Sequence, residues 1–136
     1  DFVNLETLLK ESDIITIHIP LTPETKGMIG DKEFSLMKKD ALLINTARGP
    51  IVNEEALIKA LKEKRIAGAA LDVFEKEPPD KDNPLFKLEN VIVAPHMASY
   101  TVEALSRVDL TLAQDLVKAL KGEKPQYIAN PQVFER

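Results

Sequence analysis

The most constraining feature of the sequence is a short apolar run that ends abruptly in a polar turn. Residues 41–44 are all apolar, and they are followed by Asn45-Thr46-Ala47-Arg48-Gly49. A short continuous apolar run is typical of a strand covered on both faces, as in parallel sheets. Gly49 has no Cβ and permits a tight turn and close approach of a ligand to the backbone. Arg48 lies where open α/β sheets bind ligands, so we expect its guanidinium to bind a carboxylate or phosphate; the alternative is a surface arginine that satisfies its own loop.

Strand-like and helix-like segments alternate along the rest of the chain. β-branched, small or apolar residues predict further strands over 14–19, 66–74 and 91–94. Helical spacing of apolar residues predicts helices over 5–11, 54–64 and 101–121, and a short helix capped by Asp31. The segment between the third and fourth strands is too rich in proline for a helix or central strand, and residues 123–136 read as an extended tail. This alternation predicts βαβ units and a parallel sheet, hence the α/β class.

Composition narrows the classes of partner. The 136 residues suit one ordinary domain, and 18 basic against 22 acidic residues, with no basic block, do not support a nucleic-acid or membrane-surface footprint. The absence of cysteine excludes disulfides and thiolate metal sites, and two distant histidines give no metal-ligand spacing, so we expect no metal. No apolar run has the length of a membrane span and no signal peptide opens the sequence, so we expect a cytoplasmic protein. The chain begins with Asp1 rather than methionine, and we expect it to be part of a longer polypeptide.

Three polar residues follow the expected strand ends, and a fourth lies nearby. They are Arg48, Asp72 and His96, with Glu77 five residues after Asp72. Histidine suits proton transfer near neutral pH, and a carboxylate within hydrogen-bond reach, for which Glu77 is the candidate, would stabilise its charged form. Taken singly, each residue also has a structural interpretation: Glu77 as a solvated loop acid, Asp72 as a turn cap and His96 as a packed loop residue. The other histidine, His18, is interpreted as structural.

Half of a dinucleotide site has no counterpart in the sequence. No two of the five glycines are two residues apart, so neither G-x-G-x-x-G nor a P-loop can be drawn, and no G-x-S-x-G serine motif occurs.

Several sequence segments, which together run through almost the whole chain, match those of one enzyme family. They are residues 8–14, the His18-Ile19-Pro20-Leu21-Thr22-Pro23-Glu24-Thr25 stretch, residues 44–49, residues 68–74 with Glu77-Pro78, and Pro95-His96. Together they resemble the NAD-binding domain of the D-isomer-specific 2-hydroxyacid dehydrogenases, which include glyoxylate/hydroxypyruvate reductases, D-lactate dehydrogenases and phosphoglycerate dehydrogenases. The resemblance implies a Rossmann-like parallel sheet with flanking helices, here only the second half of the nucleotide-binding domain over residues 1–122, with the tail 123–136 returning toward a substrate domain.

The resemblance also implies residue roles. Arg48 would bind the substrate carboxylate and carbonyl, His96 would transfer the hydroxyl proton, and Glu77 would tune that histidine. The cofactor, NAD or NADP, would lie along Thr46, Ala47, Asp72, Met97 and Ala98. Family members often carry glycines after the histidine, whereas this chain has Met97-Ala98-Ser99, so the local backbone contact to the cofactor is expected to differ in detail.

The implied reaction is hydride transfer between NAD(P)H and a small 2-keto or 2-hydroxy acid, in a homodimer. The chain alone, without the glycine-rich loop, is expected to be inactive, to bind cofactor weakly, and to self-associate or be marginally stable because a half sheet exposes an unpaired edge. Two alternatives remain open: a non-catalytic nucleotide-sensing or scaffold protein of the same superfamily, and an inactive folding fragment. The sequence specifies neither the 2-hydroxy acid nor the choice between NAD and NADP.

Overall fold

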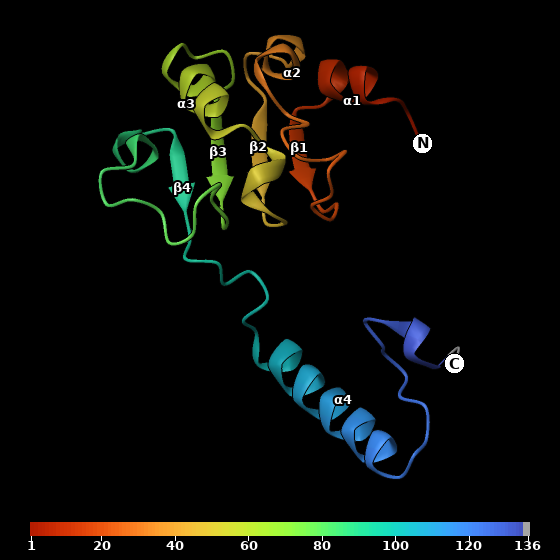
Figure 1. The fold of residues 1–136 in the computed structure, drawn as a ribbon. Helices are drawn as coiled ribbons and strands as arrows, with labels where there is room; N and C mark the ends of the chain where they lie inside the picture. The colour runs from red at the N-terminus through yellow and green to blue at the C-terminus, as the bar shows by residue number, and fades with distance from the viewer. Residues whose placement is uncertain (135–136) are drawn as a thin grey trace. The chain divides into compact units, whose positions relative to one another are not determined.

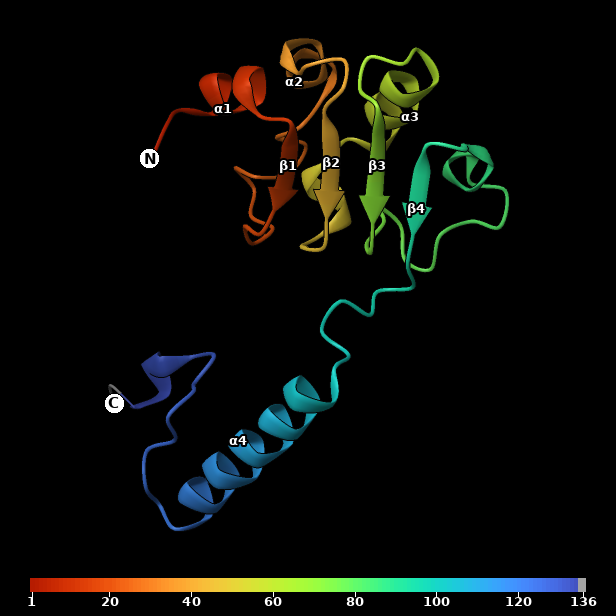
Figure 2. The same cartoon turned by 180° about the vertical axis from the view of Figure 1, so that it is seen from behind.

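A four-stranded parallel sheet is the framework of residues 1–98 (Figure 1). The computed structural model describes residues 1–134, and residue contacts divide the chain after Ala98. The strands β1 (Ile14–Ile17), β2 (Leu42–Asn45), β3 (Gly68–Leu71) and β4 (Val91–Val93) lie in the order β1-β2-β3-β4, and each neighbouring pair is parallel. The expected parallel α/β sheet is confirmed, and Figure 2 shows its four strands side by side from behind. Three strands, β1, β3 and β4, are shorter than the expected ranges 14–19, 66–74 and 91–94.

Only one face of this sheet is covered within residues 1–98. Side chains on that face are buried in β1, β2 and β3, among them Ile15, Leu43 and Leu71. On the other face Ile14, Leu42 and Ile92 are exposed. The expectation that the 41–44 run is covered on both faces is therefore wrong for this chain, because the helices α1 (Leu5–Glu11), α2 (Asp31–Leu36) and α3 (Glu54–Lys62) all contribute to the same core.

Each of these helices starts where its sequence supplies a hydrogen-bond acceptor. The side chains of Asn4 and Asn53 accept backbone N–H groups at the starts of α1 and α3. The cap of α2 is Gly30 rather than the expected Asp31, since the Glu33 carboxylate accepts from the N–H of Gly30 at 3.1 Å. Asp31 is instead the first residue of the helix.

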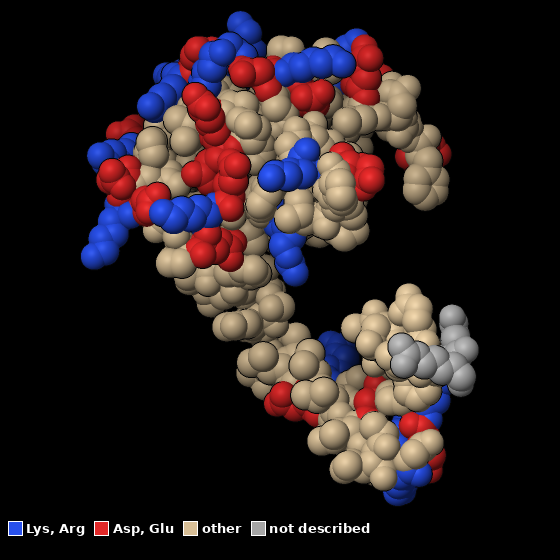
Figure 3. Space-filling view, viewed as in Figure 1, with Lys and Arg blue, Asp and Glu red and all other residues tan. Residues whose placement is uncertain are grey.

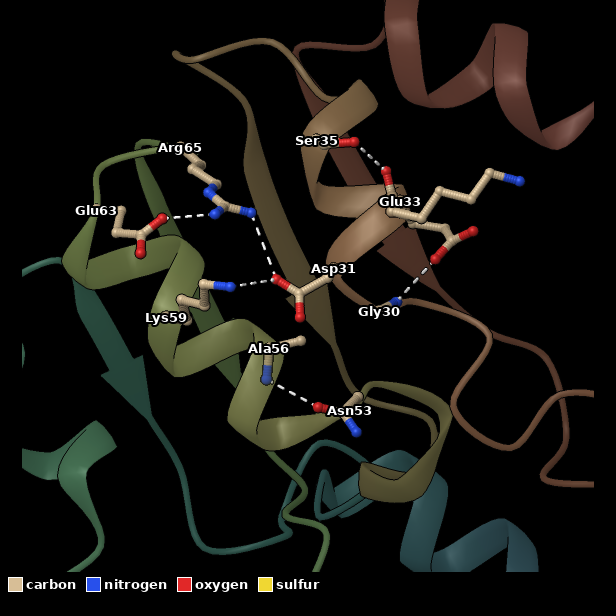
Figure 4. A network of polar contacts seen from close by, with 10 residues as sticks. Gly30, Asp31, Glu33, Ser35, Asn53, Ala56, Lys59, Glu63 and Arg65 are labelled. Atoms are coloured by element: carbon tan, nitrogen blue, oxygen red, sulfur yellow. Dashed lines mark hydrogen bonds and ion pairs between the residues drawn. The ribbon is translucent and has the colours of Figure 1, made fainter.

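The side chain of Asp31, which does not cap α2, links α2 to α3 (Figure 4). Its Oδ1 lies 3.2 Å from Nζ of Lys59 and 3.4 Å from Nη1 of Arg65, and Arg65 also pairs with Glu63 at 2.6 Å. Exposed ion pairs of this kind contribute about 1 kcal/mol or less each. The network therefore fixes the relative position of the two helices more than it stabilises the fold.

The part of the chain from Ser99 onward is built on one long helix, α4 (Val102–Leu120), which Thr101 caps and Gly122 follows with a φ of 76°. The tail after it is not simply extended. The Asp115 carboxylate accepts from the N–H groups of Gln126 and Tyr127, both at 2.8 Å, and Pro131–Phe134 form a 3-10 turn. The tail and α4 thus belong to one compact unit, which begins at Ser99.

Charge is mixed on the surface of residues 1–98. Acidic and basic side chains are interspersed on the face seen in Figure 3, with no broad area of one sign. Across the described residues, no helix combines the length and the apolar character that a membrane crossing requires.

Candidate active site

The carboxyl ends of β2, β3 and β4 are joined by a ladder of backbone hydrogen bonds that continues past the strands. The N–H of Asp72 donates to the carbonyl of Asn45 at 3.0 Å, and the N–H of His96 donates to the carbonyl of Asp72 at 2.9 Å. Three strand ends are therefore held level at one edge of the sheet. The loops that carry Arg48, Glu77 and His96 all start from this edge.

Asn45 shapes the loop that carries Arg48. Its side chain is 1% exposed, its Oδ1 accepts from the N–H of Ala47 at 3.0 Å, and its Nδ2 donates to the carbonyl of Arg48 at 3.0 Å. The Arg48 side chain is exposed, with Nη1 donating to the carbonyl of Ala47 at 2.6 Å. A guanidinium has five N–H donors, so this single bond leaves donors that can reach a ligand. Sequence reasoning treated Asn45 only as the end of the strand.

Gly49 lies against the neighbouring loop. A Cβ placed there would come within 1.8 Å of the carbonyl oxygen of Phe74 and 2.5 Å of the nitrogen of Glu75. The close approach that this glycine permits is therefore to the Phe74–Glu75 backbone, which couples the Arg48 loop to the loop of Glu77.

His96 and Glu77 form a direct pair. Nδ1 of His96 lies 2.7 Å from Oε2 of Glu77, and Oε1 of Glu77 accepts from the N–H of Phe74 at 3.0 Å. An ionised carboxylate only accepts hydrogen bonds, so Nδ1 of His96 must be the donor. In the neutral imidazole, Nε2 is then the nitrogen without a proton, which can take one up and release it again. Both side chains remain accessible, with His96 49% and Glu77 37% exposed.

The electrostatic environment keeps Glu77 ionised. Partial burial acts to raise the pKa of Glu77, but the hydrogen bond from the Phe74 N–H, the hydrogen bond and charge of His96, and the charge of Arg48 outweigh it and lower the pKa below its ordinary value. The charge of Arg48 is thus one of the influences that lower the pKa of Glu77. The structure brings Glu77 and His96 into direct contact, and Arg48 stands on the neighbouring loop after β2.

Asp72 follows β3, and its backbone bonds to Asn45 on one side and to His96 on the other. Its side chain is 5% exposed, and its Oδ1 and Oδ2 accept from the N–H groups of Met97 and Ala98, each at 2.8 Å. His96, just before these residues, has a φ of 52°, in the left-handed region that non-glycine residues rarely adopt. Asp72 therefore caps the His96 loop rather than the turn of its own segment.

An apolar cavity of about 430 Å³ adjoins the His96–Glu77 pair. Its walls include Phe74, Phe86 and Pro95, and the two phenylalanine rings meet edge to face at 5.7 Å. Ligand pockets commonly combine apolar walls with a few polar groups in this way. Phe86 could not be recognised as a wall of this cavity from the residue pattern, because it lies in the proline-rich segment.

The remaining expected residues are distributed around the same edge. Thr46 and Ala47 are half-buried after β2, and Met97 and Ala98 are exposed after β4. His18 follows β1, and its Nε2 lies 2.8 Å from Oγ1 of Thr16. Among the described residues, no three side chains of the metal-ligating types form a group that would hold a metal ion.

Comparison with known proteins gives matches over most of this chain. Residues 1–98 match the family model for the D-isomer specific 2-hydroxyacid dehydrogenase, NAD binding domain. A glyoxylate reductase of Thermofilum pendens is 53% identical over 135 residues, which is 99% of this chain but 40% of that protein. The chain thus spans well under half of that relative's length.

Solved structures show the same likeness. The D-isomer specific 2-hydroxyacid dehydrogenase of Lactobacillus delbrueckii ssp. bulgaricus, in its NAD-complexed form, aligns with a TM-score of 0.89 and 38% identity over 95% of this chain and 43% of that one. The enzyme of the same description from Xanthobacter autotrophicus, in complex with NADPH and MES, aligns with a TM-score of 0.80 and 37% identity over 94% of this chain and 52% of that one. The chain therefore belongs to the family of D-isomer-specific 2-hydroxyacid dehydrogenases.

Proposed function

We propose that this chain supplies the substrate-orienting and proton-transferring side chains of an NAD(P)-dependent oxidoreductase for small 2-keto and 2-hydroxy acids such as glyoxylate or hydroxypyruvate. The observation that carries the proposal is the 2.7 Å contact between His96 and an ionised Glu77 at the open ends of the sheet, within the field of Arg48. The chain covers 40% of a similar reductase, so the activity is proposed for a longer polypeptide that contains it.

The bound nicotinamide ring supplies the chemistry of hydride exchange with the carbon that carries the keto or hydroxyl oxygen. In reduction, His96 donates a proton from Nε2 to the substrate oxygen, and in oxidation it accepts that proton. Glu77 stabilises the charged imidazole and fixes its orientation through Nδ1. Arg48 binds the substrate carboxylate with its unused donors and polarises the adjacent carbonyl.

The residues at this edge fit the reacting end of such a cofactor. Thr46 and Ala47 are half-buried at the carboxyl end of β2, the position at which open α/β sheets bind nucleotides. We propose that they, with the exposed residues Met97 and Ala98, hold the nicotinamide end of NAD or NADP. Asp72 belongs to the same group through its contacts to Met97 and Ala98. A cytoplasmic homodimer is part of the same proposal.

The test is a hybrid enzyme in which this chain replaces the segment of the Thermofilum pendens glyoxylate reductase that it matches. We expect NADH or NADPH oxidation with glyoxylate, hydroxypyruvate or pyruvate. Arg48→Ala should raise KM for the keto acid and lower kcat, and His96→Ala should lower kcat by about a hundredfold or more, the usual contribution of a general acid. Asp115→Asn, which weakens the contacts of Asp115 with the tail and with Lys118 of α4, serves as the matched control.

A folded hybrid that binds cofactor but turns over none of the three acids would overturn the proposal and favour a nucleotide-sensing role. Folding is checked independently by thermal unfolding and by the oligomeric state relative to the parent reductase. Equal activity of the His96→Ala and unsubstituted hybrids would also reject the assigned proton-transfer role.

A further inference from the structure

The most deeply buried acid of the site lies beside the reacting groups rather than among them. Asp72 directs both carboxylate oxygens to backbone N–H groups, one of Met97 and one of Ala98, each at 2.8 Å. Its own carbonyl accepts from the N–H of His96 at 2.9 Å. One residue thus accepts three consecutive N–H groups of the loop after β4.

These three bonds hold a conformation that the loop would not adopt unaided. The φ of 52° at His96 is unfavourable for a residue with a Cβ and persists only where the surroundings fix it. The described contacts that fix it are the three acceptors of Asp72 on the backbone and Glu77 on the ring. The Glu77 bond is exposed on both sides, whereas the Asp72 carboxylate is shielded from water and its bonds are correspondingly stronger.

We propose that Asp72 is a positioning residue for the proposed reaction: it holds the His96 loop in its left-handed turn, and so presents the imidazole to Glu77 and to the substrate. This inference rests on the proposed function for its catalytic consequence but not for its structural one. It assigns to the Asp72 carboxylate an effect on the rate of proton transfer rather than on cofactor affinity alone.

The first test uses the chain itself and needs no cofactor. Amide hydrogen exchange is measured by NMR for the chain and for its Asp72→Asn and Asp72→Ala variants. We expect exchange at Met97 and Ala98 to accelerate at least tenfold in Asp72→Ala. Asp72→Asn keeps one acceptor oxygen and should accelerate only one of the two amides strongly.

Asp115→Asn is a matched control, because Asp115 binds two consecutive N–H groups in the same way within the unit that starts at Ser99. It should strongly accelerate exchange at one of Gln126 and Tyr127, because asparagine keeps one acceptor oxygen, and leave Met97 and Ala98 unchanged. If the Asp72 variants leave exchange at Met97 and Ala98 unchanged while Asp115→Asn shows its effect, the inference is overturned. Protected amides in β2 show whether each Asp72 variant has kept its fold.

The second test uses the hybrid enzyme at saturating cofactor. A positioning role predicts that Asp72→Asn lowers kcat at least tenfold with a smaller change in KM for NADH, and that Asp72→Ala lowers it further. A rise in KM for NADH with unchanged kcat would overturn the inference, because it assigns the carboxylate to the cofactor. The two tests can also give separate answers. If exchange at Met97 and Ala98 accelerates in the Asp72 variants but the unsubstituted hybrid is inactive, the proposed function is rejected and the structural inference is supported.

Discussion

Replacing Gly49 by alanine should be among the most damaging single-methyl changes in this chain. Its added Cβ would lie 1.8 Å from the carbonyl oxygen of Phe74, 1.9 Å from its carbonyl carbon and 2.5 Å from the nitrogen of Glu75. All three atoms belong to the backbone, so no side-chain rotation relieves the contact. The two loops would have to separate by about 1.2 Å before the shortest of these contacts reached 3.0 Å.

The cost follows from what that separation disturbs. Inserting a methyl group into a packed interior costs about 1–3 kcal/mol when side chains can adjust, and a contact with fixed backbone lies at or above the upper end of this range. We therefore expect Gly49→Ala to lower the free energy of unfolding by about 3 kcal/mol. With a urea dependence of about 2 kcal/mol per molar, the unfolding midpoint would fall by about 1.5 M. The same shift would move Phe74, whose N–H holds Glu77, and would lengthen the contact between Glu77 and His96.

Urea unfolding followed by far-ultraviolet circular dichroism measures this effect, with two other glycines as a graded series. A Cβ at Gly30 would find its nearest neighbour at 3.6 Å, and we expect Gly30→Ala to cost about 1 kcal/mol or less through the helix cap. A Cβ at Gly68 would lie 2.7 Å from the carbonyl oxygen of Asn90, so Gly68→Ala should fall between the two. If Gly49→Ala proves no more destabilising than Gly30→Ala, the packing argument is refuted.

Three further predictions concern polar side chains. Asn45→Ala should cost about 1–3 kcal/mol in urea unfolding, because it leaves a partly buried N–H and a partly buried carbonyl of the Arg48 loop without partners; an unchanged midpoint would contradict this. The pKa of Glu77 is lowered in the folded state, so its hydrogen bonds with the Phe74 N–H and with His96 stabilise the fold above the ordinary glutamate value of about 4.3, and this contribution disappears as the pH falls through the lower folded value. Glu77→Gln should therefore destabilise the chain at neutral pH and have little effect in strong acid, and the same loss at both pH values would reject this account. Hydrogen bonds from two backbone N–H groups lower the pKa of Asp115 as well, so acidification below the ordinary aspartate range should release the tail from α4, which amide chemical shifts of the tail would record.

The fold was predictable from the sequence to the extent that local periodicity determines it. The order of strands and helices and the caps at Asn4 and Asn53 follow from residue patterns alone. The errors concern features that depend on distant partners. β3 ends at Leu71 although apolar residues continue to Phe74, because β4 offers only three residues to pair with and Asp72 turns toward the loop after β4.

The sequence points to the residues of the candidate site but not to its internal geometry. Arg48 and His96 stand out because they follow apolar strands, and Glu77 because it lies five residues after Asp72; the structure places Glu77 2.7 Å from His96. A sequence does not show which of several acids binds a given loop, so the assignment of Asp72 to Met97 and Ala98 required coordinates. The clash that restricts Gly49 is equally invisible, since Phe74 lies 25 residues further along the chain.

Asn45 and Asp72 show how the end of a buried strand can serve both the fold and the site. Burial of a polar side chain destabilises a protein unless its hydrogen bonds are made, and both residues make theirs to the backbone of a loop that carries an exposed functional side chain. Because the backbone of Asp72 also bonds to Asn45, a displacement of one loop is transmitted to the next strand end. Substitutions at these two positions should therefore affect the conformation of Arg48 and His96 before they affect the rest of the sheet, although neither residue needs to touch a substrate.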